Sequence, residues 1–252
     1  MAEGPSIVLL RERAEVFVGE EIVRVEGDTP IDKERLLGQL VVGLQTHGKH
    51  FLIELSGGFA LRVHLLMLGS YCIDARKEKP IRLGLGFAGG REINFYSCSV
   101  RFVEEPLDAV YDPRTDIMSD AWDPALARKA LRAMPETLVC DALLDQTVFG
   151  GVGNVIKNEV LFAVRVHPLT PVGALPAATL RRLVDEARRS TFDFLAWKRA
   201  DRGDWKATLH AHSRVHAQKT CPRDATPLEK AHLGELDRLA FWCERCQVRA
   251  GS

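Results

Sequence analysis

The strongest constraint on this chain lies near its end, where three of its six cysteines form a spaced pattern. The first knuckle reads Cys221-Pro-Arg-Asp224, and the second, Cys243-Glu-Arg-Cys246, follows after 18 residues. Two short knuckles joined by a hairpin-length spacer are typical of a tetrahedral zinc site at the base of a β-hairpin. The pattern therefore predicts one Zn²⁺ ion held by Cys221, Cys243, Cys246 and a fourth ligand.

The sequence does not fix the identity of the fourth ligand, because the first knuckle ends in an aspartate and not in a cysteine. Asp224 holds the expected position, and Zn²⁺ accepts an oxygen donor. His216 lies five residues before Cys221 and is the alternative. A different ligand, or no zinc at all, is the third interpretation.

Length and composition describe an ordinary globular chain. With 252 residues, 46% hydrophobic and 27% charged, it can form one large domain or two smaller ones. No apolar run approaches the ~20 residues of a membrane span, and the start does not resemble a signal peptide. The isolated Cys72, Cys98 and Cys140 are interpreted as small buried hydrophobic residues of a reducing compartment. We therefore expect a cytoplasmic protein with no membrane partner.

Charge is balanced overall but unevenly spread along the chain. Residues 1–120 hold 14 basic and 19 acidic side chains, a net charge of −5, and residues 121–252 hold 20 and 15, a net of +5. The second half is thus expected to face an anionic partner. Chance variation between the halves is the alternative interpretation.

The sequence pattern of the first half is typical of an antiparallel β-structure. A helix is expected over 6–17, and short β-branched runs follow from 21 to 104, separated by Gly, Asp or Asn at about ten-residue spacing. This spacing is typical of a sandwich or barrel, and SGGF is expected to form a hairpin turn. The fold class predicted is α+β, with an N-terminal antiparallel β-sandwich.

The sequence pattern of the second half is typical of α-helices. Helices are expected over 124–132, from Pro135 to about 145, from Asn154 to about 162, and, as one or two helices, over 176–197. The proposed division is a β-sandwich over 1–111, a linker over 112–122, a helical domain over 123–206 and a zinc hairpin over 207–252.

The turn between two of these helices is rich in glycine. Gly150, Gly151 and Gly153 precede Asn154, which starts the next helix. The amides of such turns and of helix N-termini bind phosphate oxygens. A tight helix connection with no further role is the alternative, and Asp145 and Gln146 are expected only to cap and join the helices.

Several motifs in order resemble the Fpg/Nei family of DNA glycosylases. LLDQ-x4-GxGN-x4-E-x2-F resembles its helix–two-turn–helix motif, and MAEGPSI resembles its MPEGPEI start. THGKHFLIEL with LRVHLLMLG resembles its lysine strand and the next strand, and Arg238-x4-Cys243-x2-Cys246-Gln247 resembles its zinc finger. FYSCS and RTDIMSDAWDP are closer to the endonuclease VIII (Nei) branch. The resemblance spans essentially the whole chain.

The resemblance implies a Schiff-base mechanism. The amine of residue 2, exposed by removal of Met1, attacks the sugar, and an α-amino group with a pKa near 8 suits this better than lysine at ~10.4. Ala2 would carry the amine in place of the family's Pro, Glu3 would be the general acid/base, and Lys49 would bind phosphate and assist elimination. Ser6 replaces the family's second Glu, which affects base excision more than strand cleavage.

The resemblance also implies a set of residues that bind DNA. Asn154 and Arg238, with Lys49, would bind the phosphates beside an extruded nucleotide. Met67, Arg101 and Phe102 would fill the vacated stack, although Met67 and Phe102 can also be read as core residues. The zinc would then be structural and would support Arg238, and DNA would lie in a cleft between the two domains.

The function predicted is therefore excision of oxidised bases from DNA, with pyrimidines favoured, followed by β- or β,δ-elimination at the abasic site. The chain would act as a monomer on duplex or single-stranded DNA. A DNA-binding or lyase-only member of the same fold is one alternative. A zinc-hairpin module for protein–protein contact is another.

Overall fold

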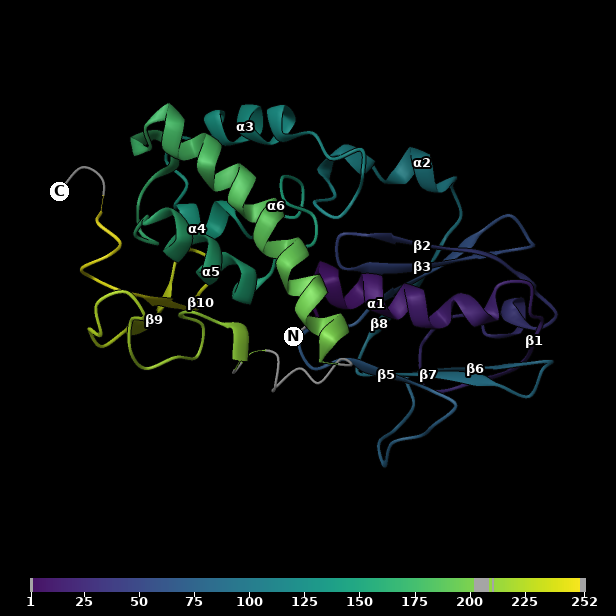
Figure 1. The fold of residues 1–252 in the computed structure, drawn as a ribbon. Helices are drawn as coiled ribbons and strands as arrows, with labels where there is room; N and C mark the ends of the chain where they lie inside the picture. The colour runs from purple at the N-terminus through teal and green to yellow at the C-terminus, as the bar shows by residue number, and fades with distance from the viewer. Residues whose placement is uncertain (1, 202–208, 210, 250–252) are drawn as a thin grey trace. The chain divides into compact units, whose positions relative to one another are not determined.

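A computed structural model of the chain describes residues 2–201, 209 and 211–249. The chain divides into two compact units, Met1–Asp112 and Pro113–Ser252, and each has a hydrophobic core of its own. Figure 1 draws the first unit in purple to blue and the second in teal to yellow. Met1 and the predicted boundary at 206/207 lie outside the described residues, and the four-part division stays a prediction.

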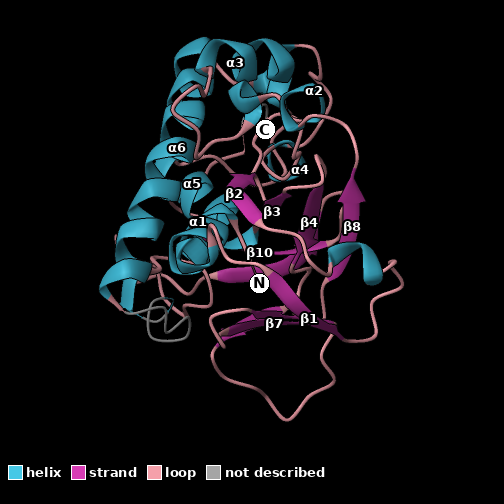
Figure 2. Cartoon of the chain, turned by 90° about the vertical axis from the view of Figure 1, so that its right-hand side faces the viewer, coloured by secondary structure: helices cyan, strands magenta, loops and turns pink. Residues whose placement is uncertain are grey.

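The first unit consists of two four-stranded antiparallel sheets, in agreement with the predicted β-sandwich. One sheet has the order β1-β6-β7-β5 and the other the order β2-β3-β4-β8. Figure 2 shows them in magenta as separate layers. The strands are Ile22–Glu26 (β1), Val41–His47 (β2), His50–Leu55 (β3), Ala60–His64 (β4), Ser70–Ile73 (β5), Leu83–Phe87 (β6), Glu92–Tyr96 (β7) and Ser99–Val103 (β8).

Alternating side chains of both sheets form the first core. Phe51 and Ile53 of β3 pair with Val63 and Leu61 of β4, and all four are buried because residues i and i+2 of a strand share a face. Helix α1 (Gly4–Ala14) adds Ile7 to this core. Short helical segments complete the unit: η1 (Glu15–Phe17), η2 (Glu34–Leu36) and α2 (Leu107–Val110).

The sequence located seven of the eight strands of this unit and missed β5. Its four residues, SYCI, are all half-buried, and the strand has no clear alternation and an apolar run of only three residues, shorter than the four to eight that indicate a strand. The expected SGGF turn does join β3 to β4, and Gly58 there has φ +79°, a conformation that glycine adopts without strain.

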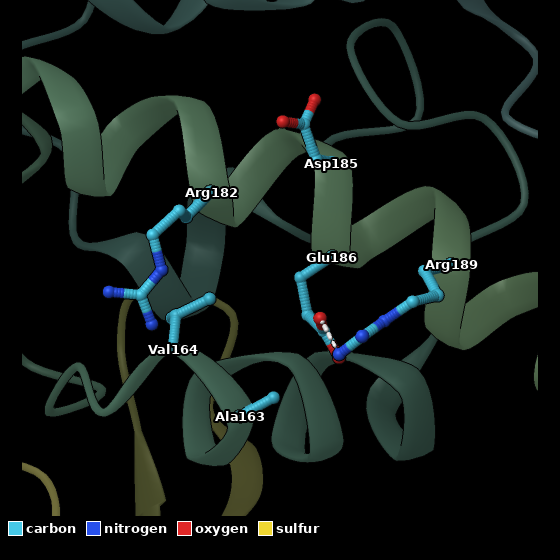
Figure 3. Close-up of a pocket in the computed structure, with 6 residues that line it drawn as sticks. All are labelled: Ala163, Val164, Arg182, Asp185, Glu186 and Arg189. Atoms are coloured by element: carbon cyan, nitrogen blue, oxygen red, sulfur yellow. Dashed lines mark hydrogen bonds and ion pairs between the residues drawn. The ribbon is translucent and has the colours of Figure 1, made fainter.

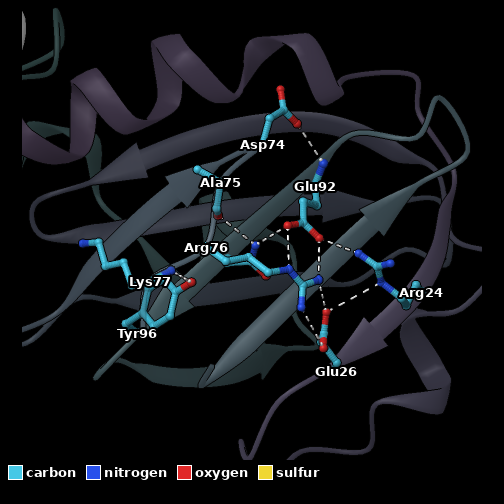
Figure 4. Close-up of polar contacts among 9 residues, drawn as sticks. Arg24, Glu26, Asp74, Ala75, Arg76, Lys77, Glu92 and Tyr96 are labelled. Carbon is cyan, nitrogen blue, oxygen red and sulfur yellow. Dashed lines mark hydrogen bonds and ion pairs between the residues drawn. The ribbon is translucent and has the colours of Figure 1, made fainter. Parts of the chain in front are cut away.

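An ion-pair network covers the outer face of the β1-β6-β7-β5 sheet (Figure 4). The Arg76 guanidinium donates to Glu26 Oε1 and to Glu92 Oε2, each at 2.6 Å. Gly84 lies beneath the network, where a Cβ atom would meet Asn94 Oδ1 at 2.7 Å. The Asn94 amide in turn donates to the carbonyl of Ala75 at 3.2 Å. The network therefore fastens the start of the β5–β6 loop to the sheet.

The second unit is helical and ends in a two-stranded hairpin. Its elements are η3 (Pro113–Thr115), α3 (Pro124–Arg132), α4 (Val139–Ala142), α5 (Asn154–Val164), η4 (Val172–Ala174), α6 (Ala177–Ala200), β9 (Glu229–Leu233) and β10 (Arg238–Trp242). The Asp123 carboxylate caps α3, accepting the amide of Ala125 at 2.8 Å, and α3 spans the predicted 124–132. Ile117 and Trp122, from the predicted linker, are buried in the helical core.

One helix prediction of this unit differs from the structure. The helix expected from Pro135 to about 145 is reduced to α4, because the preceding backbone pairs with residues 170–173. Val172 donates to the carbonyl of Thr137 at 2.9 Å, and Val139 donates to that of Thr170 at 2.9 Å. The expectation of one or two helices over 176–197 is met by one continuous helix of 24 residues, α6. None of the described helices combines the length and apolarity that crossing a membrane requires.

The ion-pair network predicts a specific response to acid. Hydrogen bonding from Arg76 holds the pKa of Glu92 below its ordinary value. A carboxylate with a depressed folded-state pKa stabilises the fold above the unfolded pKa, and this contribution is lost as pH falls through the folded pKa. We expect Glu92→Gln to lower the melting temperature at pH 7, and the difference from the unsubstituted chain to shrink as pH falls below 4.

Glu78→Gln provides the matched control, since Glu78 is an exposed carboxylate of the same loop for which the described residues provide no ion pair. This substitution should leave the melting temperature unchanged at both pH values. A Glu92→Gln deficit that stays constant from pH 7 to pH 3 would contradict the assignment.

Candidate functional site

The chain begins with a buried acid. Glu3 has no exposed surface, and its backbone is extended, so that α1 starts at Gly4 with its carbonyl accepting the amide of Ser6 at 2.8 Å. Ala2 is half-buried against the first core. A fully buried carboxyl group is rare in proteins, so Glu3 is not an ordinary surface acid.

Lys49 lies in the tight turn between β2 and β3, where Gly48 has φ +57°. Helix α1 packs along these two strands. The chain after α1 pairs with the beginning of β2, since Gly19 donates to the carbonyl of Val41 at 2.8 Å. The beginning of α1 therefore lies toward the other end of β2, as Figure 1 shows. Ala2, Glu3 and Lys49 thus belong to one end of the sandwich.

A row of three histidines crosses the sheet beside Lys49. His47, His50 and His64 are successive cross-strand partners on β2, β3 and β4, and the rings of His50 and His64 meet edge-on at 5.3 Å. The ring of Tyr111 contacts His47 and His50. Burial lowers the pKa of His50 to about 3 and also lowers the pKa of His64, with Lys49 as a second cause. Both rings are therefore neutral at pH 7.

Three residues, Met67, Arg101 and Phe102, are expected to fill the gap that an extruded nucleotide leaves in the DNA base stack. They occupy different surroundings. Met67 is exposed in the loop after β4. Arg101 is exposed on β8, and the adjacent Phe102 points to the opposite face of the sheet, since neighbouring strand residues alternate. The Phe102 ring contacts Phe59 edge-on and lies 4.4 Å from the Arg35 guanidinium. Phe102 therefore has packing partners within its own unit.

In the second unit, side chains of the two-turn motif hold its glycine-rich turn. The Asp145 carboxylate accepts the amide and the hydroxyl of Thr147 at 2.8 and 2.7 Å. The Gln146 amide donates to the carbonyl of Val152 at 3.0 Å, and its oxygen accepts the amide of Gly151, which has φ +102°. Asp145 and Gln146 therefore hold the turn that joins the helices, as expected, but they do not cap α5, whose N-cap is Gly153 without a side-chain cap bond.

Asn154 connects this motif to the hairpin. It is the first residue of α5 and is buried, and its side-chain amide donates to the carbonyl of Leu239 at 2.8 Å. Leu239 directly follows Arg238, the first residue of β10. The Asn154 Oδ1 atom is buried and has no hydrogen-bond partner among the described residues. The structure thus brings Asn154 and Arg238, which the sequence assigned to one phosphate clamp, to neighbouring positions.

The tip of the hairpin is held by Asp141 of α4. Its carboxylate, which is 8% exposed, accepts the amides of Glu235 at 2.9 Å and Leu236 at 3.3 Å. Gly234 has φ +76°, and a Cβ atom there would overlap the Asp141 carboxylate. The tip therefore requires glycine for two reasons.

Other buried polar groups hold the segments beside the base of the hairpin. The Glu159 carboxylate of α5 accepts the amides of Arg214, Val215 and His216 at 2.9 to 3.1 Å. Gln247 accepts the amide of Cys243 at 3.0 Å and donates to the carbonyl of Val166 at 2.9 Å. Buried polar groups are costly unless paired, so these contacts specify one arrangement.

The base of the hairpin gathers Cys221, Asp224, Cys243 and Cys246, whose candidate ligand atoms all lie within 4.8 Å of one another. The sulfurs of Cys221 and Cys246 are 3.7 Å apart, and Asp224 Oδ2 lies 3.5 Å from the Cys246 sulfur and 3.7 Å from the Cys243 sulfur. A tetrahedral zinc site with bonds of about 2.3 Å to sulfur and about 2.1 Å to oxygen has edges of roughly 3.6 to 3.8 Å. The donor set therefore fits a tetrahedral metal ion.

His216 does not belong to this cluster, so the alternative fourth ligand is not brought to the other donors. Its Nδ1 atom lies 2.9 Å from the side-chain nitrogen of Asn158, and its ring contacts Phe241 at 5.1 Å. Burial lowers its pKa to about 4. The sequence separation of five residues suggested proximity, but the backbone bonds to Glu159 fix His216 in another direction.

The sequence interpretation assigned no role to Asp141 or Glu159, although both position the hairpin and its surroundings. A signal for Glu159 was present, because it is the Glu of the pattern GxGN-x4-E-x2-F and is followed by the apolar residues VLF, and every residue of α5 but Ala163 is buried. An acid in such a run must have buried partners. Asp141 had no comparable signal, since its partners are 94 and 95 residues away in the chain.

Comparison with known families identifies two domains. Residues 1–99 match the formamidopyrimidine-DNA glycosylase N-terminal domain, and residues 114–191 match the formamidopyrimidine-DNA glycosylase H2TH domain.

Two curated relatives illustrate the similarity. The DNA-(apurinic or apyrimidinic site) lyase Nei2 of Mycolicibacterium smegmatis is 32% identical over 231 residues, covering 90% of this chain and 88% of that protein. Endonuclease 8-like 2 of Mus musculus is 34% identical over 183 residues, covering 71% of this chain and 51% of that protein. The chain thus aligns with about half the length of the mouse relative.

Among solved structures, the formamidopyrimidine-DNA glycosylase of Lactococcus lactis bound to DNA with an abasic site has a similar fold. Its TM-score is 0.85 at 22% sequence identity, and the match covers 98% of this chain and 100% of that one.

The hairpin tip allows a direct test of the contact with Asp141. We expect Gly234→Ala to displace the tip, because it adds a steric overlap to the roughly 1–2 kcal/mol that a left-handed conformation costs a non-glycine residue. The amides of Glu235 and Leu236 should then lose protection against hydrogen exchange, which mass spectrometry of peptides from this segment measures.

Gly58→Ala is the matched control, because Gly58 has nearly the same φ but open space around its Cβ position. It should cost the backbone strain alone and leave the hairpin protected. Unchanged exchange in Gly234→Ala would show that the Asp141 contact does not hold the tip.

Proposed function

Because this chain belongs to the formamidopyrimidine-DNA glycosylase (Fpg/Nei) family, we propose that it excises damaged bases from DNA and then cleaves the strand at the abasic site. The observation that carries the proposal is the buried Glu3 directly behind a small second residue. A carboxyl group out of water beside an α-amine provides the acid and the nucleophile that this reaction needs.

The proposed chemistry requires removal of Met1. The Ala2 amine attacks C1′ of the damaged nucleotide, the bond from C1′ to the base breaks, and Glu3 protonates the ring oxygen as the sugar opens. The product is an imine between Ala2 and C1′. Loss of a proton from C2′ then expels the 3′ phosphate by β-elimination, and water hydrolyses the imine. Ala2 supplies a primary amine, which forms the same type of bond as the family's proline.

Phosphate contacts are proposed for the residues that the sequence assigned to the clamp. Lys49 is the cation beside neutral His50 and His64, so it is suited to a phosphate near the reacting sugar. Asn154 and Arg238 are neighbours along the chain of contacts, because the Asn154 side-chain amide donates to the carbonyl of Leu239, which directly follows Arg238. The exposed Met67 and Arg101 are proposed to fill the gap that the extruded nucleotide leaves in the base stack. Phe102 is proposed to support Arg101 from the core side of β8.

The proposed substrate is an oxidised pyrimidine in duplex or single-stranded DNA. Support comes from the FYSCS and RTDIMSDAWDP segments, which resemble the Nei branch, and from relatives named endonuclease 8. Because the phosphates supply much of the affinity, binding is expected to weaken as salt increases.

A lyase acting mainly on pre-existing abasic sites is the second candidate. Ser6 stands where the family has a second glutamate, and this favours strand cleavage over base excision. A relative named for abasic-site lyase activity, at 32% identity, supports the same candidate.

The proposed mechanism predicts a covalent intermediate. Incubation of the mature protein with duplex DNA containing an abasic site, followed by sodium borohydride, should yield a one-to-one protein–DNA adduct because the hydride reduces the imine. Intact mass of the same sample should show that Met1 is absent. Peptide mapping should place the DNA on Ala2.

Two variants sharpen this test. Ala2→Pro should retain the adduct, since it restores the family's secondary amine. A chain with one uncleaved residue before Ala2 should lose the adduct yet keep its affinity for DNA at low salt. The absence of any adduct with the mature protein would exclude the enzyme and leave a DNA-binding protein of this fold.

We further propose that the hairpin cluster binds one structural zinc ion. Three thiolates and one carboxylate are a donor set that Zn²⁺ accepts, and four protein ligands leave no open coordination position for catalysis. Their spacing supports a tetrahedral site. The ion would fix the base of the hairpin that presents Arg238.

Metal analysis tests this assignment. Natively purified protein should contain one zinc per chain, Asp224→Cys should retain it, and Asp224→Ala should weaken zinc binding by about tenfold or more. His216→Asn should keep full occupancy. Zinc loss in His216→Asn but not in Asp224→Ala would overturn the choice of Asp224, and metal-free native protein would overturn the site.

A further inference from the structure

A short two-stranded ribbon joins the two sheets of the first unit, away from the residues proposed for base excision. It is formed by residues 19–23, which lead into β1, and residues 38–42, which lead into β2. The two segments bond to each other through their backbones, and Glu21 and Leu40 are antiparallel bridge partners. Figure 1 shows α1 running from the N-terminus toward the end of the unit where β1 lies. The ribbon therefore belongs to the end of the sandwich opposite the start of α1.

One face of the ribbon is aliphatic and exposed. Cross-strand partners share a face, and so do residues i and i+2 of a strand. Val23 and Val42 therefore lie on the same face as Glu21 and Leu40. The Val23, Leu40 and Val42 side chains are 52%, 44% and 57% exposed, whereas the residues between them point into the first core. Contiguous exposed apolar side chains mark interaction sites, although single ones are ordinary.

Two more exposed aliphatic residues extend this face at its ends. Val18 and Leu37 directly precede Gly19 and Gly38, whose amides bond across the ribbon at 2.8 and 2.9 Å. From residue 37 to residue 42 the face is about 17 Å long, as expected for a strand. The side chains that we call the ribbon face are Val18, Val23, Leu37, Leu40 and Val42.

Carboxylates without cationic partners accompany the ribbon face. Glu21 lies within it, and Glu15 and Glu20 flank Val18 in the chain. The Glu20 carboxylate accepts the amide of Gly89 at 3.1 Å, a contact that leaves its charge uncompensated. Within the described part of the chain, none of these three carboxylates forms an ion pair.

The cations closest to the ribbon in the chain are engaged elsewhere. Arg24 pairs with Glu92, and Arg35 donates to both carboxylate oxygens of Glu104 at 2.8 and 3.0 Å. The Lys33 amine donates to a backbone carbonyl at 3.3 Å. The ribbon face therefore combines aliphatic side chains with negative charge.

The backbone on both outer sides of the ribbon is already paired. The Glu21 carbonyl accepts the amide of Ala88 at 3.0 Å, and the Leu40 carbonyl accepts the amide of Ser56 at 3.0 Å. A partner that adds a β-strand needs an edge with unpaired backbone groups. A helix bonds its own backbone internally and contacts a surface through its side chains. The ribbon face is therefore better suited to a helix than to an added strand.

We propose that the ribbon face binds a basic amphipathic helix of a partner protein. Aliphatic side chains of that helix pack on Val23, Leu40 and Val42, and its Lys or Arg side chains pair with the three carboxylates. Charge complementarity carries the choice of partner, because the acids of this face have no cation of their own. A helix of about eleven residues, or three turns, matches the length of the face.

The same charges disfavour two other occupants. A DNA backbone carries a phosphate at every nucleotide and would meet the three carboxylates. A second copy of this chain, docked about a two-fold axis, would bring the same surface of both copies together and place acid against acid. A basic helix avoids both conflicts.

The pocket between α5 and α6 supplies a control for the effect of charge alone. Figure 3 shows Arg182 and Arg189 together with Asp185 and Glu186, so that this lining contains both signs of charge. Asp185 is an exposed carboxylate for which the described residues provide no ion pair. Asp185→Lys therefore changes the net charge as Glu21→Lys does, outside the ribbon face.

The test uses the full chain and a fluorescein-labelled helical peptide of about three turns, with leucines at every third or fourth position and lysines beside them. Fluorescence anisotropy should show saturable binding to the unsubstituted chain. Glu21→Lys should weaken binding by about fivefold or more. The double substitution Leu40→Thr and Val42→Thr should have a similar effect, and threonine keeps the preference for a strand. Cleavage of abasic DNA should stay unchanged in both variants.

Asp185→Lys and Val248→Thr are the matched controls, since Val248 is an exposed valine outside the ribbon face. Both should bind the peptide as the unsubstituted chain does. Equal weakening by Asp185→Lys, equal binding of a peptide with serines in place of its leucines, or no saturable binding would overturn the proposal. Displacement of the peptide by an abasic duplex would assign the face to DNA. A dimer in sedimentation velocity that the Leu40/Val42 variant abolishes would assign it to a second copy.

Discussion

Buried polar contacts at both ends of the β9–β10 hairpin determine how the second unit is built. The apolar cluster beneath the hairpin is small, formed by Phe162, Val215, Cys221 and Cys243 with a few partly buried neighbours. Asp141 holds the tip, Asn154 holds the start of β10, and the cysteine–aspartate cluster gathers the base. Because a buried polar group without its partner is costly, the hairpin has one arrangement on α4 and α5. That arrangement decides where Arg238 points.

In the first unit, electrostatics concentrates positive charge on few groups. The row of His47, His50 and His64 looks basic in the sequence, but burial keeps His50 and His64 neutral at pH 7. Lys49 and the neighbouring Arg62 therefore carry the charge beside the β2–β3 turn. On the opposite sheet, Arg76 and its acidic partners neutralise one another, so this sheet presents charges without a net cation at its centre. The difference agrees with the proposal that Lys49 contacts a phosphate near the reacting sugar.

Sequence patterns predicted the elements whose contacts are local. The SGGF hairpin around Gly58 and the start of α3 at Pro124 follow from a few adjacent residues, and so do most strands. The metal-site donors were found because knuckle spacing is a local signal, although His216 could be excluded only in three dimensions. Elements that depend on distant pairing were missed or mispredicted. Strand β5 depends on β7, and the residues before α4 lose their helix to pairing with residues 168–173. Glu3 was assigned through resemblance alone, since its burial is a tertiary property.

The length of the 18-residue spacer between the knuckles determines which way its side chains face, because both ends of the hairpin are fixed. The tip is fixed on Asp141 and the base on the cluster, so the chain between them has a set length. Side chains alternate along a strand, and one inserted residue would turn every following side chain to the other face. A residue inserted in β10 between Arg238 and Leu239 would therefore turn Arg238 to the other face of the strand relative to the Leu239 contact with Asn154, without removing a single ligand or contact residue. The number of residues between the two knuckles therefore fixes which way Arg238 faces. This number can be as strict a requirement as the identity of the residues at either end.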